Sequence, residues 1–325
     1  MKKHNNIELL KQEIEKKEKK YHVSPIEYTS VIQEFHFFSE NDILIQNKLK
    51  EIPFFHYHFY CFEKHHFLAI QEVNEEKMEK KEIKKKYLLF RYKKERKVYL
   101  EDYFSRYSLL SNSLLTKNTY IRNLIQLYEK MLQTLIKMNK SGICYFNWKK
   151  DNIFMNEKDY PILENFDKSI DFSSINEEYI SKLCKVEKEL KYMPLESIIL
   201  CFTIKYEYNS LSIGILEDLF IKLKKQLSSL QYEEFISLFQ PFINLSKKDI
   251  INKLMNSINT WDNYGLSILF TDYVEDLIKK NRFETKFPFL PKWLLILKKN
   301  ADINPKKREN LEKTLELFKD LFIGS

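Results

Sequence analysis

The side chains with the clearest capacity for chemistry lie in one stretch, residues 142–167, which reads GICYFNWKKDNIFMNEKDYPILENFD. Its polar candidates are Asn147, Lys149, Asn152, Asn165 and Asp167. A lysine ammonium can hold a phosphate, and oxygen ligands, above all charged ones, hold Mg²⁺. Because neutral amides stand beside Lys149, we expect it to face a site without carboxylates. Residues of these types could bind a phosphate, or Lys149 and Asn152 could simply hydrogen-bond to backbone.

A long helix leads into this stretch, and a hairpin carries its second half. Apolar residues recur at helical spacing over residues 119–139, which predicts the helix. Two short apolar segments, residues 153–156 and 161–166, flank a charged turn at residues 157–159, which predicts the hairpin. The candidate residues then lie in the loop before the hairpin and at its end.

This layout resembles the catalytic loop and the metal-binding loop of a protein kinase, which read H-R-D-x-K-x-x-N and D-F-G. The matching residues are Tyr145, Phe146 and Asn147 for H-R-D, Lys149 for the loop lysine, Asn152 for the metal-binding asparagine, and Asn165, Phe166 and Asp167 for D-F-G. The resemblance implies that both aspartates required for phosphate transfer are asparagine here, at Asn147 and Asn165.

Three later segments follow in the order of kinase landmarks. They are MPLE at 193–196, similar to A-P-E, WDNYGLS at 261–267, similar to D-x-W-S-x-G, and NPKKR at 304–308, similar to N/D-P-x-x-R. The resemblance implies a buried salt bridge between Glu196 and Arg308, and it makes Asp262 the acidic residue that opens the central large-lobe helix. The sequences of these motifs are most similar to those of the divergent serine/threonine kinase-like proteins of nucleocytoplasmic large DNA viruses, and the resemblance covers residues 39–322.

The fold that the resemblance implies is α+β: a protein kinase-like two-lobed fold with a reduced β-containing N-lobe and a mainly helical C-lobe. We divide the chain into a charged helix at 1–20, the N-lobe at 21–95 and the C-lobe at 96–325. Segments rich in aromatic and β-branched residues predict strands at 26–38, 54–62, 66–73 and 86–92. We expect Ser39 to cap a helix that begins at Glu40.

The C-lobe is expected to continue with a short segment at 97–104, the long helix and several more helices. Apolar spacing places these at 176–191, 196–209, 213–230, 231–240, 247–258, 262–279 and 309–322. The apolar runs at 197–202 and 293–297 are far shorter than the roughly 20 residues of a membrane span. With no apolar segment near the N-terminus, we expect a protein without a membrane association or a secretory signal.

Two parts of the small lobe depart from the kinase pattern. No glycine precedes Gly142, so no Gly-rich loop can cover the phosphates, where backbone amides must approach without a Cβ. Residues 22–47 contain no lysine or arginine, so the phosphate-pairing strand lysine has no candidate. Glu40 marks the place of the helix glutamate but has no evident partner.

The two asparagines remove the rest of the machinery. Asn147 cannot accept the substrate hydroxyl proton, and general-base assistance contributes about 10²–10⁴ in rate. Asn165 replaces a charged ligand of Mg²⁺. Asp167 or Asp151 could substitute only by reaching from a displaced position.

Composition adds three limits. The net charge of +8 is spread over many helices without a dense basic stripe, so we do not expect nucleic acid as a partner. Cys61, Cys144, Cys184 and Cys201 show no paired spacing, which predicts free thiols in a reducing compartment. His56 and His58 share one face of a predicted strand, but no cysteine or carboxylate joins them, and we predict no metal site there.

The sequence therefore predicts a catalytically inactive kinase-like protein, a pseudokinase, which acts as a scaffold or regulatory binding protein of a large DNA virus. The alternatives are a divergent active serine/threonine kinase that uses Asp151 or Asp167 and an unplaced lysine, and a structural component of the virion or replication site. We expect no cofactor beyond weak, Mg²⁺-independent ATP binding, and a viral or host protein as the partner. The predicted location is intracellular, in the host cytoplasm or at the replication site, with the virion as a further site.

Overall fold

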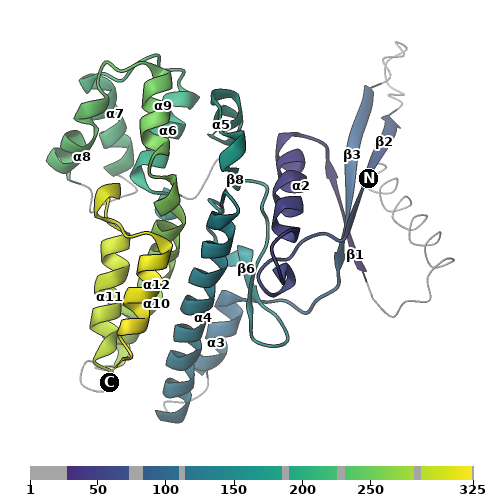
Figure 1. The fold of residues 1–325 in the computed structure, drawn as a ribbon, viewed down its shortest axis with the longest axis vertical. Helices are drawn as coiled ribbons and strands as arrows, with labels where there is room; N and C mark the ends of the chain where they lie inside the picture. Colours follow the sequence, from purple (N-terminus) through teal and green to yellow (C-terminus); the bar gives the residue numbers. More distant parts are fainter. Residues whose placement is uncertain are drawn as a thin grey trace.

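A computed structural model describes residues 28–72, 83–109, 114–184, 190–224, 231–281 and 287–323. The predicted helix at 1–20 lies outside these residues. The described chain forms a small lobe of one sheet and one helix beside a larger, mainly helical lobe (Figure 1). The predicted α+β class and its division into two unequal lobes are confirmed.

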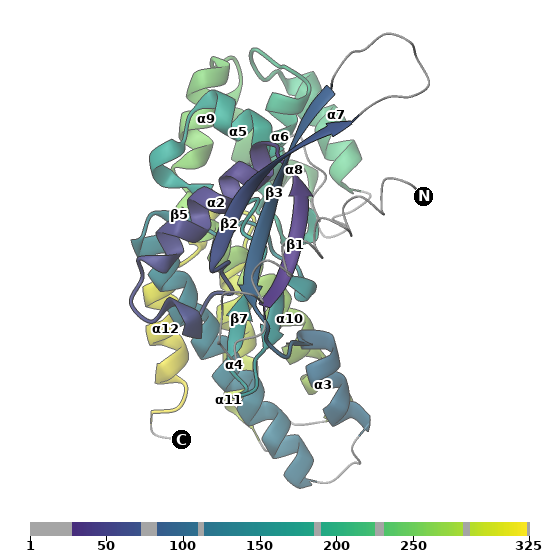
Figure 2. The same ribbon diagram turned by 90° about the vertical axis from the view of Figure 1, so that its right-hand side faces the viewer.

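The small lobe is a three-stranded antiparallel sheet with one helix. Strands β1 (Tyr28–Glu34), β2 (Lys64–Glu72) and β3 (Ile83–Lys93) lie in the order β1-β3-β2, so β3 is central (Figure 2). Residues 87–91 of β3 are all buried. Helix α2 (Phe37–Lys50) buries Ile45 and Leu49.

Two small-lobe predictions are wrong in detail. Helix α2 begins before Glu40, because His36 and not Ser39 is its cap: the His36 imidazole accepts from the Ser39 backbone N–H at 3.2 Å, and the Ser39 hydroxyl accepts from the His36 N–H at 2.9 Å. This reciprocal capping box satisfies two otherwise unpaired donors. The sequence prediction missed it because histidine is rarely the capping residue.

The predicted strand at 54–62 is instead a short 3-10 helix, Phe55–Tyr57, followed by extended chain. This segment pairs with the large lobe rather than with the sheet: the Tyr60 N–H donates to the Leu163 carbonyl at 2.8 Å, and the Leu163 N–H donates to the His58 carbonyl at 3.0 Å. The His58 ring also contacts the Thr134 hydroxyl at 2.7 Å. The aromatic run therefore joins the lobes.

The chain enters the large lobe through β4 (Val98–Tyr99), which pairs with β6, and helix α3 (Leu100–Leu109). The predicted long helix is α4 (Leu114–Lys140), and the predicted hairpin is β6 (Ile153–Met155) with β7 (Pro161–Leu163). Strands β5 (Ile143–Cys144) and β8 (Ile170–Asp171) bracket the candidate loops.

All seven remaining predicted helices are present, although their bounds differ from those predicted. They are α5 (Glu177–Cys184), α6 (Leu195–Lys205), α7 (Ile213–Lys224), α8 (Tyr232–Phe239), α9 (Lys247–Met255), α10 (Trp261–Asn281) and α12 (Leu311–Asp320). Helix α11 (Phe289–Asn300) was not predicted. Within the described residues, each helix is too short or too polar to cross a bilayer.

The large lobe contains two hydrophobic cores. One lies among α4, α10, α11 and α12, where the rings of Tyr128, Phe270, Trp293 and Phe318 meet. The second lies among α5 to α9, at the upper end of the lobe in Figure 1. The chain between α6 and α10 thus has apolar packing of its own.

The predicted free thiols at Cys184 and Cys201 are wrong, because the structure joins these residues in a disulfide. Helices α5 and α6 pack side by side and bring their cysteines together, although these lie 17 positions apart in the sequence. No local spacing signals such a tertiary pair. Cys61 and Cys144 are buried and are not joined in a disulfide.

Candidate functional site

The loop that resembles the catalytic loop is anchored by Asp262 at the start of α10. Its carboxylate accepts from the backbone N–H groups of Tyr145 at 2.8 Å and Phe146 at 3.1 Å, and from the Trp148 indole at 3.1 Å. Asp262 is only 1% exposed, and burial raises its pKa while the three donors lower it. Phe146 has a φ of 53°, a costly conformation that these bonds hold in place.

Gly265, one helical turn after Asp262, lets the loop approach α10. A Cβ at this position would lie 2.2 Å from the Trp148 ring, so any side chain would displace the loop. The loop conformation therefore depends on a buried carboxylate and on a glycine of the same helix.

The three asparagines of the predicted site converge and hydrogen-bond to one another. The Asn152 amide donates to the Asn147 carbonyl at 2.7 Å, and the Asn165 amide donates to the Asn152 side-chain oxygen at 2.8 Å. Asn147 donates to the Asn165 carbonyl at 2.8 Å and to the Asp167 carboxylate at 3.1 Å. The side chains at both metal-ligand positions are thus bonded directly to each other.

Of the two proposed substitute carboxylates, only one reaches the site. Asp167 contacts Asn147 and lines the space between the lobes, whereas Asp151 is exposed and does not line it. Lys149 lines the same space, together with Lys168. The expectation that Lys149 faces no carboxylate is wrong, because the loop after Phe166 brings Asp167 to the same space.

That space is a cleft of about 570 Å³ between the sheet and the large lobe. From the small lobe it is lined by Thr29, Val31 and Gln33 of β1, Asp42 of α2, and Phe90 and Tyr92 of β3. Its size falls within the range of ligand-binding pockets. A ligand-sized cleft therefore remains although the predicted chemistry is incomplete.

One side of the cleft is occupied by an ion pair that the sequence did not reveal. Lys97 pairs with Glu164, which also accepts from the Tyr99 hydroxyl at 3.0 Å. The Lys97 ammonium lies 3.8 Å from the Tyr60 ring centroid and 4.9 Å from that of Phe154. Cation–π contact and ion pairing both fix this lysine. No sequence spacing links residues from three separate segments.

The acidic residue of α2 that faces the cleft is Asp42, and not Glu40, which is exposed. Asp42 is 7% exposed, and its Oδ1 has no hydrogen-bond partner in the described structure. Burial, with a smaller contribution from the Asp167 charge, raises the pKa of Asp42 to about 7, against hydrogen bonds from Gln46 and the Phe166 backbone. Asp42 lies on the same helical face as Gln46 and Leu49, so helical spacing in the sequence could have identified it as an inward-facing residue.

No described strand residue supplies Asp42 with a cation. The β1 residues that line the cleft are neutral, as the absence of lysine and arginine from residues 22–47 predicts. Helix α2 is instead fixed by Asn41, which donates to the carbonyls of Asp167 at 2.8 Å and Ser169 at 2.9 Å, and by Lys48, which pairs with Asp171 at 2.6 Å. Neutral hydrogen bonds and an ion pair therefore join α2 to the large lobe.

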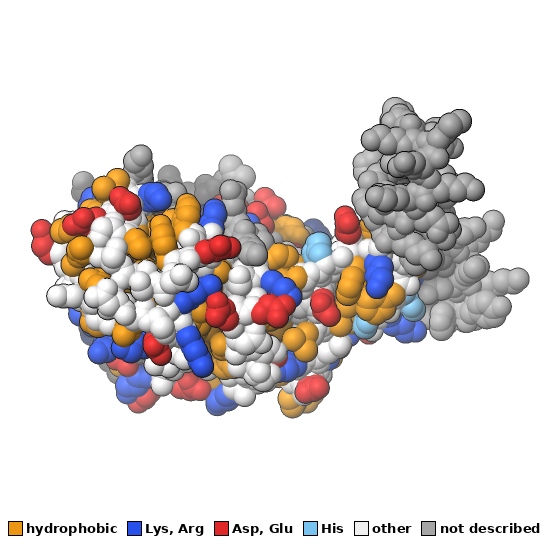
Figure 3. Space-filling model, turned by 90° about the horizontal axis from the view of Figure 1, so that it is seen from above, with side chains coloured by type: hydrophobic (Ala, Val, Ile, Leu, Met, Phe, Trp, Pro, Cys, Tyr) orange, Lys and Arg blue, Asp and Glu red, His pale blue; other side chains and the backbone are white. Residues whose placement is uncertain are grey.

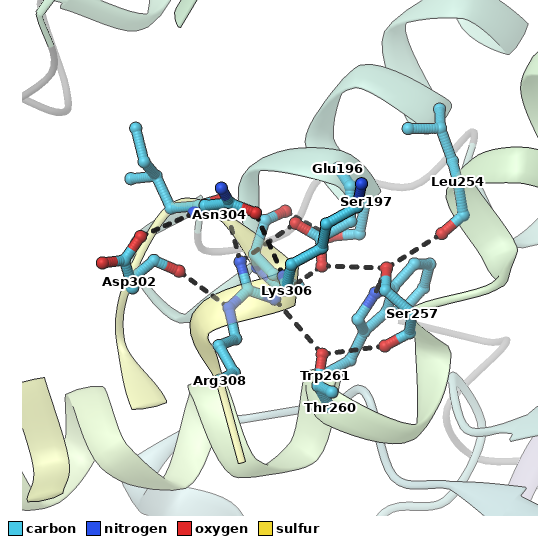
Figure 4. Close-up of polar contacts among 12 residues, drawn as sticks. Glu196, Ser197, Leu254, Ser257, Thr260, Trp261, Asp302, Asn304, Lys306 and Arg308 are labelled. Carbon is cyan, nitrogen blue, oxygen red and sulfur yellow. Dashed lines mark hydrogen bonds and ion pairs between the residues drawn. The ribbon is translucent and has the colours of Figure 1, made fainter. Parts of the chain in front are cut away.

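The Glu196–Arg308 salt bridge is present (Figure 4). The guanidinium donates to both carboxylate oxygens, at 2.5 Å and 3.0 Å, with side-chain exposures of 0% for Arg308 and 3% for Glu196. Arg308 also donates to the Asp302 carbonyl at 2.7 Å, and Ser257 donates to Glu196 at 3.2 Å. Such a bidentate pair fixes the segment before α12 against α6.

The described residues contain no group of three or more His, Cys, Asp and Glu side chains placed to hold a metal ion. Figure 3 shows that basic and acidic side chains intermingle on the face drawn there.

No protein-family model and no curated protein matches the sequence. Among solved structures, the chain is similar to a rhoptry antigen kinase domain of Toxoplasma gondii. The identity is 10%, the TM-score is 0.46, and the match covers 90% of this chain and 73% of that one.

Proposed function

We propose that this chain is a pseudokinase: a kinase-like protein without phosphate transfer that acts as a scaffold or regulatory binding protein. The observation that carries the proposal is the 2.8 Å hydrogen bond between the Asn165 and Asn152 side chains. Both stand at positions where a kinase holds Mg²⁺ with oxygen ligands. An amide has no charge to offer a hard cation, and the Asn152 oxygen already accepts a hydrogen bond.

The carboxylates that line the cleft support the same proposal, because each has another role or a reduced charge. Glu164 pairs with Lys97, and Asp167 accepts from Asn147. Burial raises the pKa of Asp42 to about 7, so this carboxyl carries less negative charge at neutral pH than an exposed aspartate does. Asn147 can accept no proton from a substrate hydroxyl, which removes a contribution of about 10²–10⁴ in rate.

A nucleotide could still bind in the cleft through Lys149 and Lys168, without a metal ion. We expect this binding to be weak and insensitive to Mg²⁺. Calorimetric titration of the full chain with ATP, with and without Mg²⁺, tests the proposal. Equal affinities support it, and a tight complex that forms only with Mg²⁺ contradicts it.

One observation favours a second candidate, a divergent active serine/threonine kinase. The Asp167 carboxylate lies 3.1 Å from the Asn147 amide and lines the cleft, so it is placed near where a base would act. This candidate requires transfer of labelled phosphate from ATP that Asp167→Ala abolishes and Asp151→Ala leaves unchanged.

The partner that we propose is a viral or host protein, bound by the helical lobe. We also propose, from the sequences of the motifs alone, that the chain comes from a nucleocytoplasmic large DNA virus. It would then act inside the host cell, at the replication site or in the cytoplasm.

A further inference from the structure

A groove of about 750 Å³ opens on the large lobe, away from the cleft between the lobes. Its walls are the end of α8 with the turn that follows it, the end of α9 with the turn before α10, and residues 303–307. Apolar side chains line it: Leu238, Phe239, Phe242, Leu254, Ile303 and Pro305. The groove thus lies where the second hydrophobic core meets the segment before α12.

Hydrogen bonds hold the floor of this groove. Glu196 contributes to it and is held by Arg308 through two hydrogen bonds, and the Thr260 hydroxyl donates to the Ser257 carbonyl at 2.8 Å (Figure 4). The Asn304 side chain accepts from the Lys306 backbone N–H at 3.0 Å, which fixes the outer wall. A preformed wall lowers the ordering cost of binding.

The rim of the groove is predominantly basic. Lys253 and Lys306 are exposed and have no ion pair with another described residue, while Lys307 lies 3.4 Å from Asp302. Glu234 is the exposed carboxylate that lines the same groove. An occupant that presents carboxylates to this rim and apolar side chains to the lining would complement both.

We propose that this groove binds an amphipathic, acidic helical segment of a partner protein. Helix-in-groove recognition uses apolar residues at spacings of three and four to fill such a surface, with charges along the edges setting specificity. The inference rests on the proposed scaffold function and assigns it a surface. A long nucleic acid is disfavoured, because apolar side chains line most of the groove and few lysines line its rim.

The test uses the full chain and three fluorescent synthetic peptides, followed by anisotropy. The first is an amphipathic helix with leucine at helical spacing and glutamate between. The second replaces the glutamates with lysine, and the third scrambles the first. The acidic amphipathic peptide should bind saturably, and about tenfold more tightly than either of the others. Equal binding of all three, or no binding, overturns the proposal.

Matched variants locate the binding. Lys253→Glu with Lys306→Glu should weaken the acidic peptide about tenfold. Lys205→Glu with Lys292→Glu makes the same charge change at exposed positions outside the groove and should leave the affinity within about twofold. Circular dichroism checks that both variants fold.

An equal loss of peptide affinity in both variants overturns the proposal, because it would show that the peptide is attracted by the net charge of the protein and not bound at the groove. Tighter binding of duplex DNA than of the acidic peptide overturns it as well. Peptide affinity at this groove is measured without ATP, so its outcome is separate from any result on phosphate transfer in the cleft.

Discussion

Replacement of Asp42 by asparagine should make the protein more stable at neutral and alkaline pH. The Asp42 carboxyl is 7% exposed, its Oδ1 has no hydrogen-bond partner in the described structure, and burial raises its pKa from 3.8 to about 7. A buried charge without a counter-ion is unfavourable. The asparagine side chain would have nearly the same shape as the aspartate and could not ionise.

The size and sign of the effect follow from linkage. Because the pKa is higher in the folded state, the folded protein binds the proton more tightly than the unfolded chain does. Below the unfolded pKa of 3.8 the carboxyl causes no penalty; the penalty grows as pH rises and is complete above about 7. A pKa raised from 3.8 to about 7 corresponds to about 4 kcal/mol, of which about 3 kcal/mol develops between about pH 5 and pH 8.

Urea unfolding of the full chain at about pH 5 and about pH 8 measures this difference. Asp42→Asn should gain stability over the wild type at the higher pH, by up to about 4 kcal/mol, and much less at the lower pH. Glu40→Gln, an exposed carboxylate on the same helix, is the control and should show no such dependence. A variant that is less stable at about pH 8 would refute the reasoning, because Asp42 would then have a counter-charge.

Three further predictions concern the supports of the site. Arg308→Ala strands the buried Glu196 carboxylate and should cost about 3–5 kcal/mol in urea unfolding, whereas Lys306→Ala on the surface should cost little. Gly265→Ala should lower the free energy of unfolding by about 1–3 kcal/mol because its Cβ meets an indole ring, and Gly214→Ala, with open space around it, should not. Dithiothreitol should lower the wild-type free energy of unfolding by about 2–4 kcal/mol through loss of the α5–α6 disulfide. A destabilised Gly214→Ala variant would contradict the glycine prediction. A wild-type free energy of unfolding that dithiothreitol leaves unchanged would contradict the disulfide prediction.

The elements that the sequence predicted best are those whose signal is local. The long helix α4 and the β6–β7 hairpin have clear periodicity and a charged turn, and both were placed within a few residues. Helix α11 was not predicted, because the short continuous apolar run at 293–297 does not by its periodicity distinguish a helix from a strand. The aromatic run at 54–62 looks like a strand, but its backbone partners lie in the other lobe.

The residues of the candidate site also differ in how far the sequence predicts them. Motif order identified the Glu196–Arg308 pair and the neutral residues at Asn147 and Asn165, because these depend on residue type and sequence position. The orientation of Asp42 depends on where α2 begins, which an unusual histidine cap decides. The Lys97–Glu164 pair joins segments that only the folded chain brings together.

The central claim is that neutral amides at the metal-ligand positions leave the cleft unable to hold a divalent cation. A titration of Mn²⁺, a stand-in for Mg²⁺ with an EPR signal when free, into the full chain with ATP tests it most directly. The Asn165→Asp variant, which restores one charged ligand, is the comparison. We predict that the wild type binds no more Mn²⁺ than ATP alone does and that the variant binds more. Stoichiometric Mn²⁺ binding by the wild type beyond that of ATP would contradict it.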